Sequence, residues 1–385
     1  RDDHDLGVRL SAVLARQLYC AEESLTRRLS LSGNAVAMAR RLGDHRTLAF
    51  ALLARHQAVW TRDNAEERLT LAGEVAQLAE LLADDELAFQ VRYFRVADLL
   101  EVGDIDAAEA EREILHRLEV EFRQPFYRYL SEQLAIARKI YVGDLAEAES
   151  RFEAAYELGQ QAQHPEALAI MVLELGAIRG LQGRGDELAD GLQDYVDQFP
   201  EMAAARVGLA ASYAEAGKLE EARAEFEHFA ADRFATVPND FQWIASMTAL
   251  VVACIAIEDT ENAQRLYELL LSYAGRDVMT GYGITCEPSV DHYLGLLATM
   301  LEQWDDAEMH FAAAAERARR MEARPYLAQT QFDWASMLVH RGRQLDRGRA
   351  LDLAQNALAA AEQLGMGLLS ERAATLRKQC LSAAS

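Results

Sequence analysis

Proline, cysteine and long apolar runs are all scarce in this sequence. The longest uninterrupted apolar stretch, residues 249–257, is nine residues long, about half of what crosses a bilayer. No basic-then-apolar signal peptide opens the chain. The four cysteines lie far apart without a CxxC pair, which predicts free thiols of a cytoplasmic protein rather than a disulfide or zinc framework. They are Cys20, Cys254, Cys286 and Cys380.

Basic residues are outnumbered, with 39 Lys and Arg against 62 Asp and Glu and a formal net charge of -23. Such a chain repels nucleic-acid phosphates and anionic lipid surfaces. We therefore expect no direct nucleic-acid partner and no membrane contact, unless a local basic face exists. The chain begins at Arg1 without an initiator Met, close to a predicted helix, so a fragment of a longer protein is one interpretation that the sequence leaves open.

Catalytic motifs are also missing. The sequence has no GxxxxGK[ST] phosphate loop, no HExxH metal motif and no GxSxG elbow. Gly180, Gly183 and Gly185 stand in the order GxxGxG between two helical segments, which is typical of a helix turn and not of a dinucleotide site. No two of the nine histidines are spaced i, i+4. We predict no enzymatic activity, no cofactor and no metal.

Instead the sequence repeats one phrase, with EVGDIDAAEA from Glu101, YVGDLAEAES from Tyr141 and EAGKLEEARA from Glu215. An alanine follows each such turn, at intervals of 40, 41, 33, 41, 44 and 43 residues. In four units an aromatic residue follows four positions later, on the same helix face. The alanines are Ala108, Ala148, Ala189, Ala222, Ala263, Ala307 and Ala350, and the aromatics are Phe152, Phe226, Tyr267 and Phe311.

The six prolines follow the same rhythm, because each stands just before a long apolar helical segment. Proline fits the first helical turn and breaks a helix interior. They are Pro125, Pro165, Pro200, Pro238, Pro288 and Pro325. Strand patterns are nearly absent. The predicted helical hairpins are 7–42, 45–82, 85–120, 124–162, 164–198, 200–232, 239–274, 288–321 and 324–364, with a capping helix at 367–383.

One hairpin cannot bury its apolar face alone, so the hairpins should stack. We therefore predict an all-α, right-handed superhelical solenoid of about nine helical hairpins plus a capping helix. It forms a single domain, 1–385. Within it, residues 1–84 are less regular repeats, 85–274 central repeats, 275–288 an irregular loop, and 289–385 the C-terminal repeats and cap. The loop is either a connector or a binding edge.

The segment from Ala203 to Phe229 resembles a tetratricopeptide repeat. Gly217 takes the turn position, Ala222 the small-residue position and Phe226 the aromatic position, with Leu209 and Tyr213 in the first-helix core. A period near 40 rather than 34 resembles the longer-helix repeats of bacterial maltose-regulator-like transcription activators. The resemblance as a repeat type covers almost the whole chain.

The C-terminal stretches 304–342 and 350–373 resemble the end of large actinobacterial regulators. In that family, an ATPase switch module of the signal-transduction (STAND) type precedes a long tetratricopeptide region. The output is often a nucleotide cyclase or a helix-turn-helix. Neither the ATPase phosphate loop nor an output domain is present in this sequence, so the resemblance implies the sensor or interaction arm of such a regulator.

Two sets of residues are candidates for binding. The first helices of tetratricopeptide hairpins line the concave face, and Tyr, Trp and Arg are common interface anchors. The groove candidates are Arg92, Tyr93, Tyr127, Arg128, Gln242, Trp243, His292 and Tyr293. A basic cluster in the last two units is either a solvated face or a docking surface for an acidic partner or another module. Its candidates are Arg317, Arg320, Arg324, Arg341 and Arg343.

The sequence thus predicts a non-catalytic sensor whose concave groove binds a partner protein, a peptide or a small inducer. Binding would shift an inactive–active equilibrium in an attached ATPase module, provided the ligand has different affinities for the two states. The alternatives are a free-standing adaptor that joins two proteins and, less favoured, a repeat-fold enzyme with its site in the groove.

Overall fold

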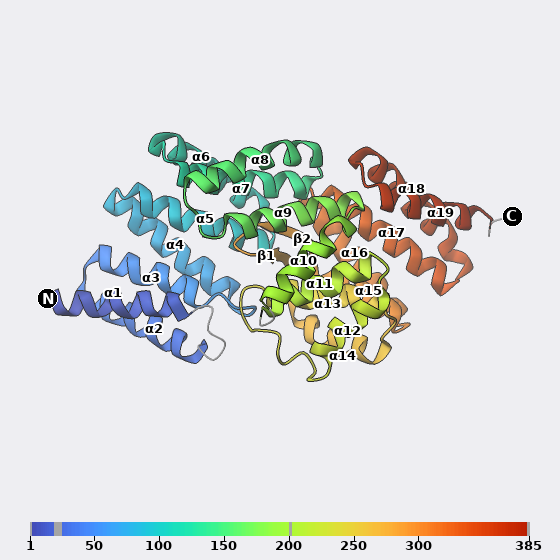
Figure 1. Cartoon of the computed structure of the whole chain (residues 1–385), viewed down its shortest axis with the longest axis horizontal. Coiled ribbons are helices and arrows are strands. Elements are labelled where there is room, and N and C mark those ends of the chain that lie inside the picture. The colour runs from blue at the N-terminus through green and yellow to red at the C-terminus, as the bar shows by residue number, and fades with distance from the viewer. Residues whose placement is uncertain (1, 19–24, 200–201, 383–385) are drawn as a thin grey trace. The chain divides into compact units, whose positions relative to one another are not determined.

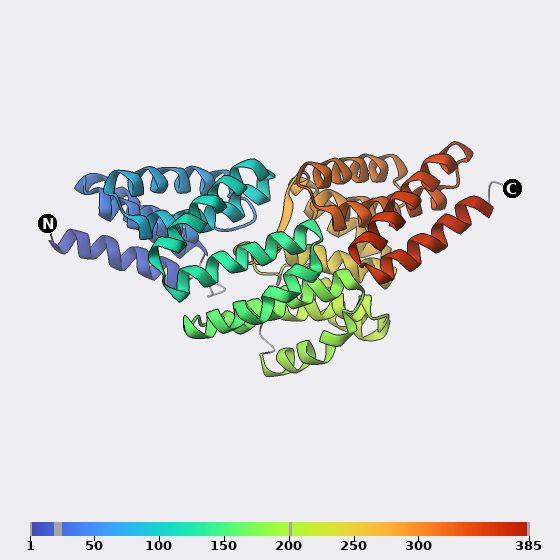
Figure 2. The same cartoon turned by 90° about the horizontal axis from the view of Figure 1, so that it is seen from above.

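The computed structural model describes residues 2–18, 25–199 and 202–382, and nearly all of them form antiparallel helical hairpins (Figures 1 and 2). The chain divides into two compact units. Unit 1 comprises Arg1–Ser131 with Pro238–Phe241, and unit 2 comprises Glu132–Val237 with Gln242–Ser385. Each unit is a stack of hairpins, so the predicted all-α solenoid fold is confirmed.

The described residues of unit 1 form six helices and the first part of a seventh, α7, which continues into unit 2. The helices are α1 (Asp2–Gln17), α2 (Leu25–Leu42), α3 (His45–Ala58), α4 (Ala65–Leu82), α5 (Asp85–Val102), α6 (Ile105–Phe122) and α7 (Pro125–Val142).

The repeated Gly-Asp phrase forms the turns between these helices. Gly103 ends α5 with a left-handed backbone (φ 80°), a conformation that glycine adopts at little cost. Asp104 then caps α6, since its carboxylate accepts a hydrogen bond from the Ala107 N–H (3.1 Å). Asp44 and Asp84 cap α3 and α5 in the same way. The phrase therefore encodes a tight helix–turn–helix corner.

Unit 2 contains the remaining helices and one pair of strands. They are α8 (Leu145–Gln161), α9 (Ala167–Gln182), α10 (Asp186–Gln198), α11 (Ala203–Glu215), α12 (Leu219–Ala230), α13 (Trp243–Ala256), α14 (Thr260–Leu270), η2 (Leu271–Tyr273), β1 (Asp277–Thr280), β2 (Thr285–Ser289), α15 (Val290–Met300), α16 (Trp304–Arg320), α17 (Arg324–Arg341), η3 (Gln344–Asp346), α18 (Arg347–Leu364) and α19 (Gly367–Ser382).

The helix pairs match the predicted hairpins one for one, including the capping helix α19. The small residues after the turns pack as expected: Ala108, Ala148, Ala222, Ala263, Ala307 and Ala350 are all buried. A buried alanine lets the neighbouring helix approach closely. Ala189 and Cys20 lie outside the described side chains, whereas the other three cysteines are free and buried.

Residues 275–288 require a correction, because they contain a β-hairpin and not an irregular loop. β1 and β2 pair antiparallel, with Met279 opposite Cys286, and the register shifts between Asp277 and Val278. Pro288 lies in β2 beside that shift and does not open a helix. A strand at the edge of a sheet tolerates proline where no backbone N–H is needed. The strands are too short to show a clear period of two in the sequence.

Candidate functional site

The interior of unit 2 is filled by its own β-hairpin. Val278, Met279, Ile284 and Cys286 are all buried. The hairpin contacts first helices of several repeats, including α9, α13 and α15. The face on which a tetratricopeptide groove would bind a ligand is therefore covered, in this unit, by a segment of the same chain.

Polar groups of the hairpin are engaged inside this core. Arg317 of α16 donates from Nε to Asp277 Oδ2 (2.9 Å). Burial nevertheless raises the pKa of Asp277 to about 6, although Arg317 acts in the opposite direction. Thr280 donates to Glu287 Oε1 (3.0 Å), and burial raises the pKa of Glu287 as well. The hairpin thus enters the core with carboxyl groups that resist ionisation.

The thiol of Cys286 is not activated. Burial raises its pKa well above the usual range, and a thiolate is the reactive form of cysteine. Burial also raises the pKa of Cys254, to about 12. Both residues therefore act as small apolar side chains.

A second buried cluster joins α14, α15 and α16. His310 Nδ1 lies 2.9 Å from Asp291 Oδ1, and its Nε2 lies 3.1 Å from Tyr267 Oη. This Asp–His–hydroxyl order is that of nucleophilic catalysts. However, burial and Asp306 raise the pKa of Tyr267, which makes its hydroxyl harder to deprotonate. Neither of the cavities described below includes the three residues. The cluster ties three helices together.

Unit 1 contains a buried cluster of charges between α3, α4 and α5. Arg68 Nε donates to Asp98 Oδ1 (2.6 Å), and the guanidinium also binds Glu101. His56 Nε2 lies 2.6 Å from Asp98 Oδ2. Burial opposes the charge of Arg68, but Glu101 and Asp98 outweigh it and raise its pKa. The Trp60 ring lies 4.6 Å from the guanidinium and covers it. The sequence offered no signal for this cluster beyond ordinary helix charges.

Most predicted groove residues of unit 1 are packed. Arg92 is buried and pairs with Glu111 (2.6 Å) and Glu80 (3.1 Å). Tyr93 is buried. Tyr127 is buried against the rings of Phe89 and Phe122, at 4.8 and 4.5 Å between centroids. Arg128 alone of the four is exposed.

The groove candidates of unit 2 have similar surroundings. Trp243 is buried beside Tyr273, and Gln242 is half-buried. Tyr293 is buried and donates to Glu287 (3.5 Å) beneath the hairpin. These residues support the fold.

His292 lies in the same core. Its Nδ1 is 3.0 Å from Thr330 Oγ1, and burial lowers its pKa to about 4. Asp333 Oδ2 is 3.6 Å from Nε2, but burial raises the pKa of Asp333 to about 7. Near pH 6 both groups are therefore largely uncharged, and the contact is not an ion pair.

The predicted basic cluster separates into paired and exposed arginines. Arg317 pairs with Asp277, and Arg341 pairs with Glu308 (2.7 Å) and Asp346 (2.8 Å). Arg343 is exposed, 3.7 Å from Asp305, which is also exposed. Arg320 and Arg324 are exposed. Only part of the cluster is therefore available to a partner.

Unit 2 closes on itself, since its first and last hairpins touch. Arg138 of α7 donates to the Met321 carbonyl (3.1 Å) and pairs with Glu322 (2.7 Å). The rings of Tyr141 and Tyr326 lie 5.5 Å apart between centroids. We call this set of contacts the seam. It makes unit 2 a ring of hairpins with the β-hairpin at its centre.

Close packing at the seam requires a glycine at position 143. Gly143 has φ 87°, and a Cβ there would lie 2.7 Å from Leu364 Cδ2 and 3.0 Å from Pro325 Cγ. The α7–α8 turn therefore comes close to both α17 and α18 because residue 143 lacks a side chain.

A cavity of about 680 Å³ opens at the seam. Its apolar walls come from both sides of the closure, and its charged groups include Arg319 and Arg324. The lining residues are Val142, Gly143, Asp144, Ala318, Arg319, Glu322, Arg324, Leu327, Gln363 and Leu364. A smaller cavity of about 290 Å³ is lined by residues 302–306 and Arg343. The sequence could not indicate the seam, because the contributing segments are about 180 residues apart.

The described residues were also compared with the requirements of a metal site and of a membrane-spanning helix. Within residues 2–18, 25–199 and 202–382, no three His, Cys, Asp or Glu side chains gather in a way that could hold a metal ion. In the same part of the chain, no helix has both the length and the apolar character needed to cross a bilayer.

Comparison of the sequence with family models and with curated proteins finds no match. Similar solved structures include a circular tandem repeat protein with novel repeat topology and enhanced subunit contact surfaces, at 13% identity over 98% of this chain and 97% of that one, with a TM-score of 0.19. Another is the APC/C hetero-tetramer Cut9–Hcn1, at 15% identity over 99% and 96%, with a TM-score of 0.21. At these scores the fold assignment rests on the hairpins described above, which form a tetratricopeptide-like helical repeat.

Proposed function

We propose that the chain is the non-catalytic sensor and protein-interaction region of a bacterial regulatory protein with an attached ATPase module. The observation that carries the proposal is the cavity at the seam of unit 2. A ligand that contacts both sides of the seam has more contacts in the closed ring than in an opened one. It therefore has the differential affinity that a sensor needs.

The inducer site lies at the seam and not in the concave groove, because the β-hairpin fills the interior of the ring. In the seam cavity, Asp144 pairs with Lys139 (3.1 Å) and Glu322 pairs with Arg138 (2.7 Å). Arg324 has no such carboxylate partner within the described residues. The favoured inducer is therefore a small molecule with an apolar body and an acidic group.

The test uses the purified chain and a panel of small carboxylates and phosphate esters. Thermal unfolding is followed with each compound, for the wild type and for Leu327→Trp, which fills the half-buried side of the cavity. If the cavity is a sensor site, at least one compound should raise the Tm of the wild type without raising the Tm of the variant. The same compound should change nucleotide hydrolysis by the intact regulator. If Leu327→Trp folds normally and no compound of the panel raises the Tm of the wild type alone, the sensor role is contradicted.

The size of the native polypeptide tests the attached module separately. An antibody against this chain should detect a protein far larger than the 42.9 kDa of this sequence. A band near 43 kDa would instead favour the second candidate, a free-standing adaptor. One observation favours an adaptor: the exposed apolar side chains of α9, which could contact a partner protein without any small ligand.

A further inference from the structure

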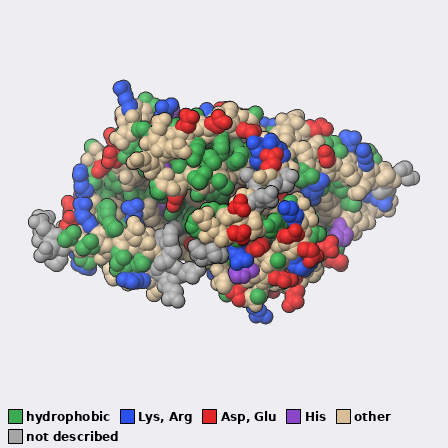
Figure 3. Space-filling view, viewed as in Figure 1, with side chains coloured by type: hydrophobic (Ala, Val, Ile, Leu, Met, Phe, Trp, Pro, Cys, Tyr) green, Lys and Arg blue, Asp and Glu red, His purple; other side chains and the backbone are tan. Residues whose placement is uncertain are grey.

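Helix α9 exposes large aliphatic side chains on a face where a solvated helix would carry polar ones. Leu168, Val172 and Leu173 are 57%, 44% and 39% exposed, and they share one face at i, i+4 and i+5. The opposite face of α9 is buried, at Ile170 and Ile178. Figure 3 shows hydrophobic side chains gathered over α8 and α9. A contiguous apolar surface of this kind marks an interaction site more often than chance exposure.

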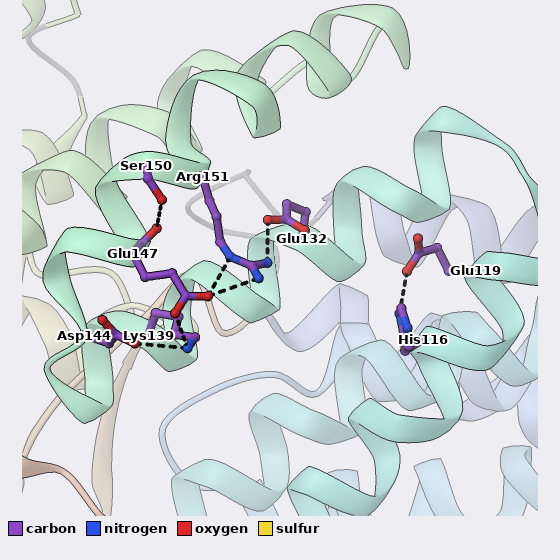
Figure 4. A network of polar contacts seen from close by, with 8 residues as sticks. All are labelled: His116, Glu119, Glu132, Lys139, Asp144, Glu147, Ser150 and Arg151. Carbon is purple, nitrogen blue, oxygen red and sulfur yellow. Dashed lines mark hydrogen bonds and ion pairs between the residues drawn. The ribbon is translucent and has the colours of Figure 1, made fainter.

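Several cations of the neighbouring helices α7, α8 and α9 are already engaged in ion pairs. Arg151 of α8 pairs with Glu132 (2.9 Å) and Glu147 (3.2 Å), and Lys139 binds Glu147 (2.6 Å), as Figure 4 shows. On the other side, Arg179 of α9 pairs with Glu149 (2.6 Å). These side chains therefore leave little positive charge to attract an acidic partner.

Several carboxylates, in contrast, stay open to solvent. Glu149, Glu153 and Glu157 form one stripe of α8 at i, i+4 and i+8, and Glu149 at its start contacts Arg179 and Gln182 of α9. Since α8 and α9 pack against each other, the stripe lies on the helix next to α9. Glu153 and Glu157 are exposed, and neither takes part in an ion pair among the described residues.

The apolar centre and the acidic border together select the partner. We propose that this surface, the α8–α9 face (Glu153, Glu157, Leu168, Val172 and Leu173), docks a basic amphipathic helix of a partner protein. Leu-type side chains of such a helix cover the exposed aliphatic residues, and its Lys or Arg side chains meet the free carboxylates. Anionic lipid and nucleic acid are repelled by the same carboxylates.

This docking site rests on the proposed protein-interaction function and adds the class of partner. It does not depend on a ligand in the seam cavity. The probe is a fluorescent peptide of about 18 residues with Leu on one helical face and Lys on the other. Two matched peptides replace Lys by Glu or scramble the order. Fluorescence anisotropy measures their binding to the whole chain at low and high salt.

The basic amphipathic peptide should bind, and the acidic and scrambled peptides should not. Leu168→Ser with Val172→Ser should weaken binding by about tenfold or more. Glu153→Gln with Glu157→Gln should weaken it about threefold to tenfold and reduce its salt dependence. The matched control is Leu81→Ser in unit 1, a 64% exposed leucine outside the face, which should bind like the wild type. Circular dichroism checks that each variant is folded.

The proposal is overturned if all three peptides bind alike, or if folded face variants bind the basic peptide as the wild type does. It is also overturned if sedimentation shows wild-type self-association that Leu168→Ser with Val172→Ser abolishes, since the occupant is then a second copy. A ligand response at the seam that persists when peptide binding fails leaves the sensor function standing. The two proposals therefore fail separately.

Discussion

The two units bury polar side chains in different ways. In unit 1, opposite charges cancel between neighbouring helices, as Arg68 does with Asp98 and Glu101. In unit 2, the carboxyls of the β-hairpin are held with raised pKa values, and His292 is held uncharged. In the first unit the buried carboxylates are held by an arginine, whereas in the second unit burial of the inserted segment opposes the ionisation of Glu287 and His292, and only Asp277 among them pairs with an arginine. The comparison teaches that one repeat type can build both a charge-paired stack and a filled ring.

Breaking the charge cluster of unit 1 should have the largest effect. Asp98→Ala removes the carboxylate that both Arg68 and His56 contact. Their buried side chains then lose a hydrogen-bond acceptor. We expect a loss of about 3–5 kcal/mol in the free energy of unfolding, as for other buried pairs that lose one partner. Urea unfolding followed by circular dichroism measures it. The control is Glu80→Ala, an exposed partner of Arg92. Equal losses in the two variants would contradict a special role for the cluster.

The seam of unit 2 is tested by two glycines with the same backbone conformation. Gly143 and Gly217 have φ 87° and 72°, but a Cβ at Gly217 meets nothing within 4 Å. Alanine costs about 1–2 kcal/mol at either site from the left-handed backbone alone. Gly143→Ala should cost about 1–3 kcal/mol more, because its methyl group overpacks against Pro325 and Leu364. Urea unfolding of the two variants gives the difference. No excess at Gly143 would mean that the seam is loose.

The suppressed charge of His292 predicts a pH effect in unit 2. Its pKa is about 4 when folded and about 6.5 when unfolded, so the unfolded state binds the proton first as pH falls. Stability is therefore lost as pH falls from about 6.5 toward 4, with a contribution of about 2 kcal/mol at pH 5. Asp277 acts in the opposite direction, because its pKa is raised to about 6 and its contribution is lost as pH rises from about 4.

His292→Gln removes the first of these two effects. The variant should lose less stability than the wild type between pH 7 and pH 5, by about 2 kcal/mol in urea unfolding. Asp277→Asn should act in the opposite sense, by steepening the loss below pH 6. Parallel pH profiles of wild type and His292→Gln would show that the histidine already carries its charge in the folded state.

Two basic residues near the C-terminus of unit 2 give the last comparison, and one of them has the smallest expected effect. Arg341 is almost fully buried and has two carboxylate partners, so Arg341→Ala should cost about 1–3 kcal/mol. Arg324 is exposed, and Arg324→Ala should stay within about 0.5 kcal/mol of the wild type. Thermal unfolding compares them. A large loss for Arg324→Ala would mean that it supports the fold and is not open to a ligand.

The hairpin boundaries were predictable because their signals are local. The turn glycine, the capping aspartate and the small residue such as Ala148 all lie within a few positions of the corner they specify. The β-hairpin was missed because β1 and β2 are short and their partners are distant helices. The aromatics Tyr93 and Trp243 were assigned to a groove because an amphipathic pattern cannot separate a core face from a concave one.

The sequence by itself determined a stack of helical hairpins, since periodicity, turns and caps act over one or two helical turns. Only the tertiary structure decided which surfaces are free. It placed the β-hairpin inside the ring, brought Gly143 against Leu364, and left Leu168 and Val172 exposed beside unpaired carboxylates. These outcomes depend on contacts between residues far apart in the chain, and burial and charge pairing are properties of that packing.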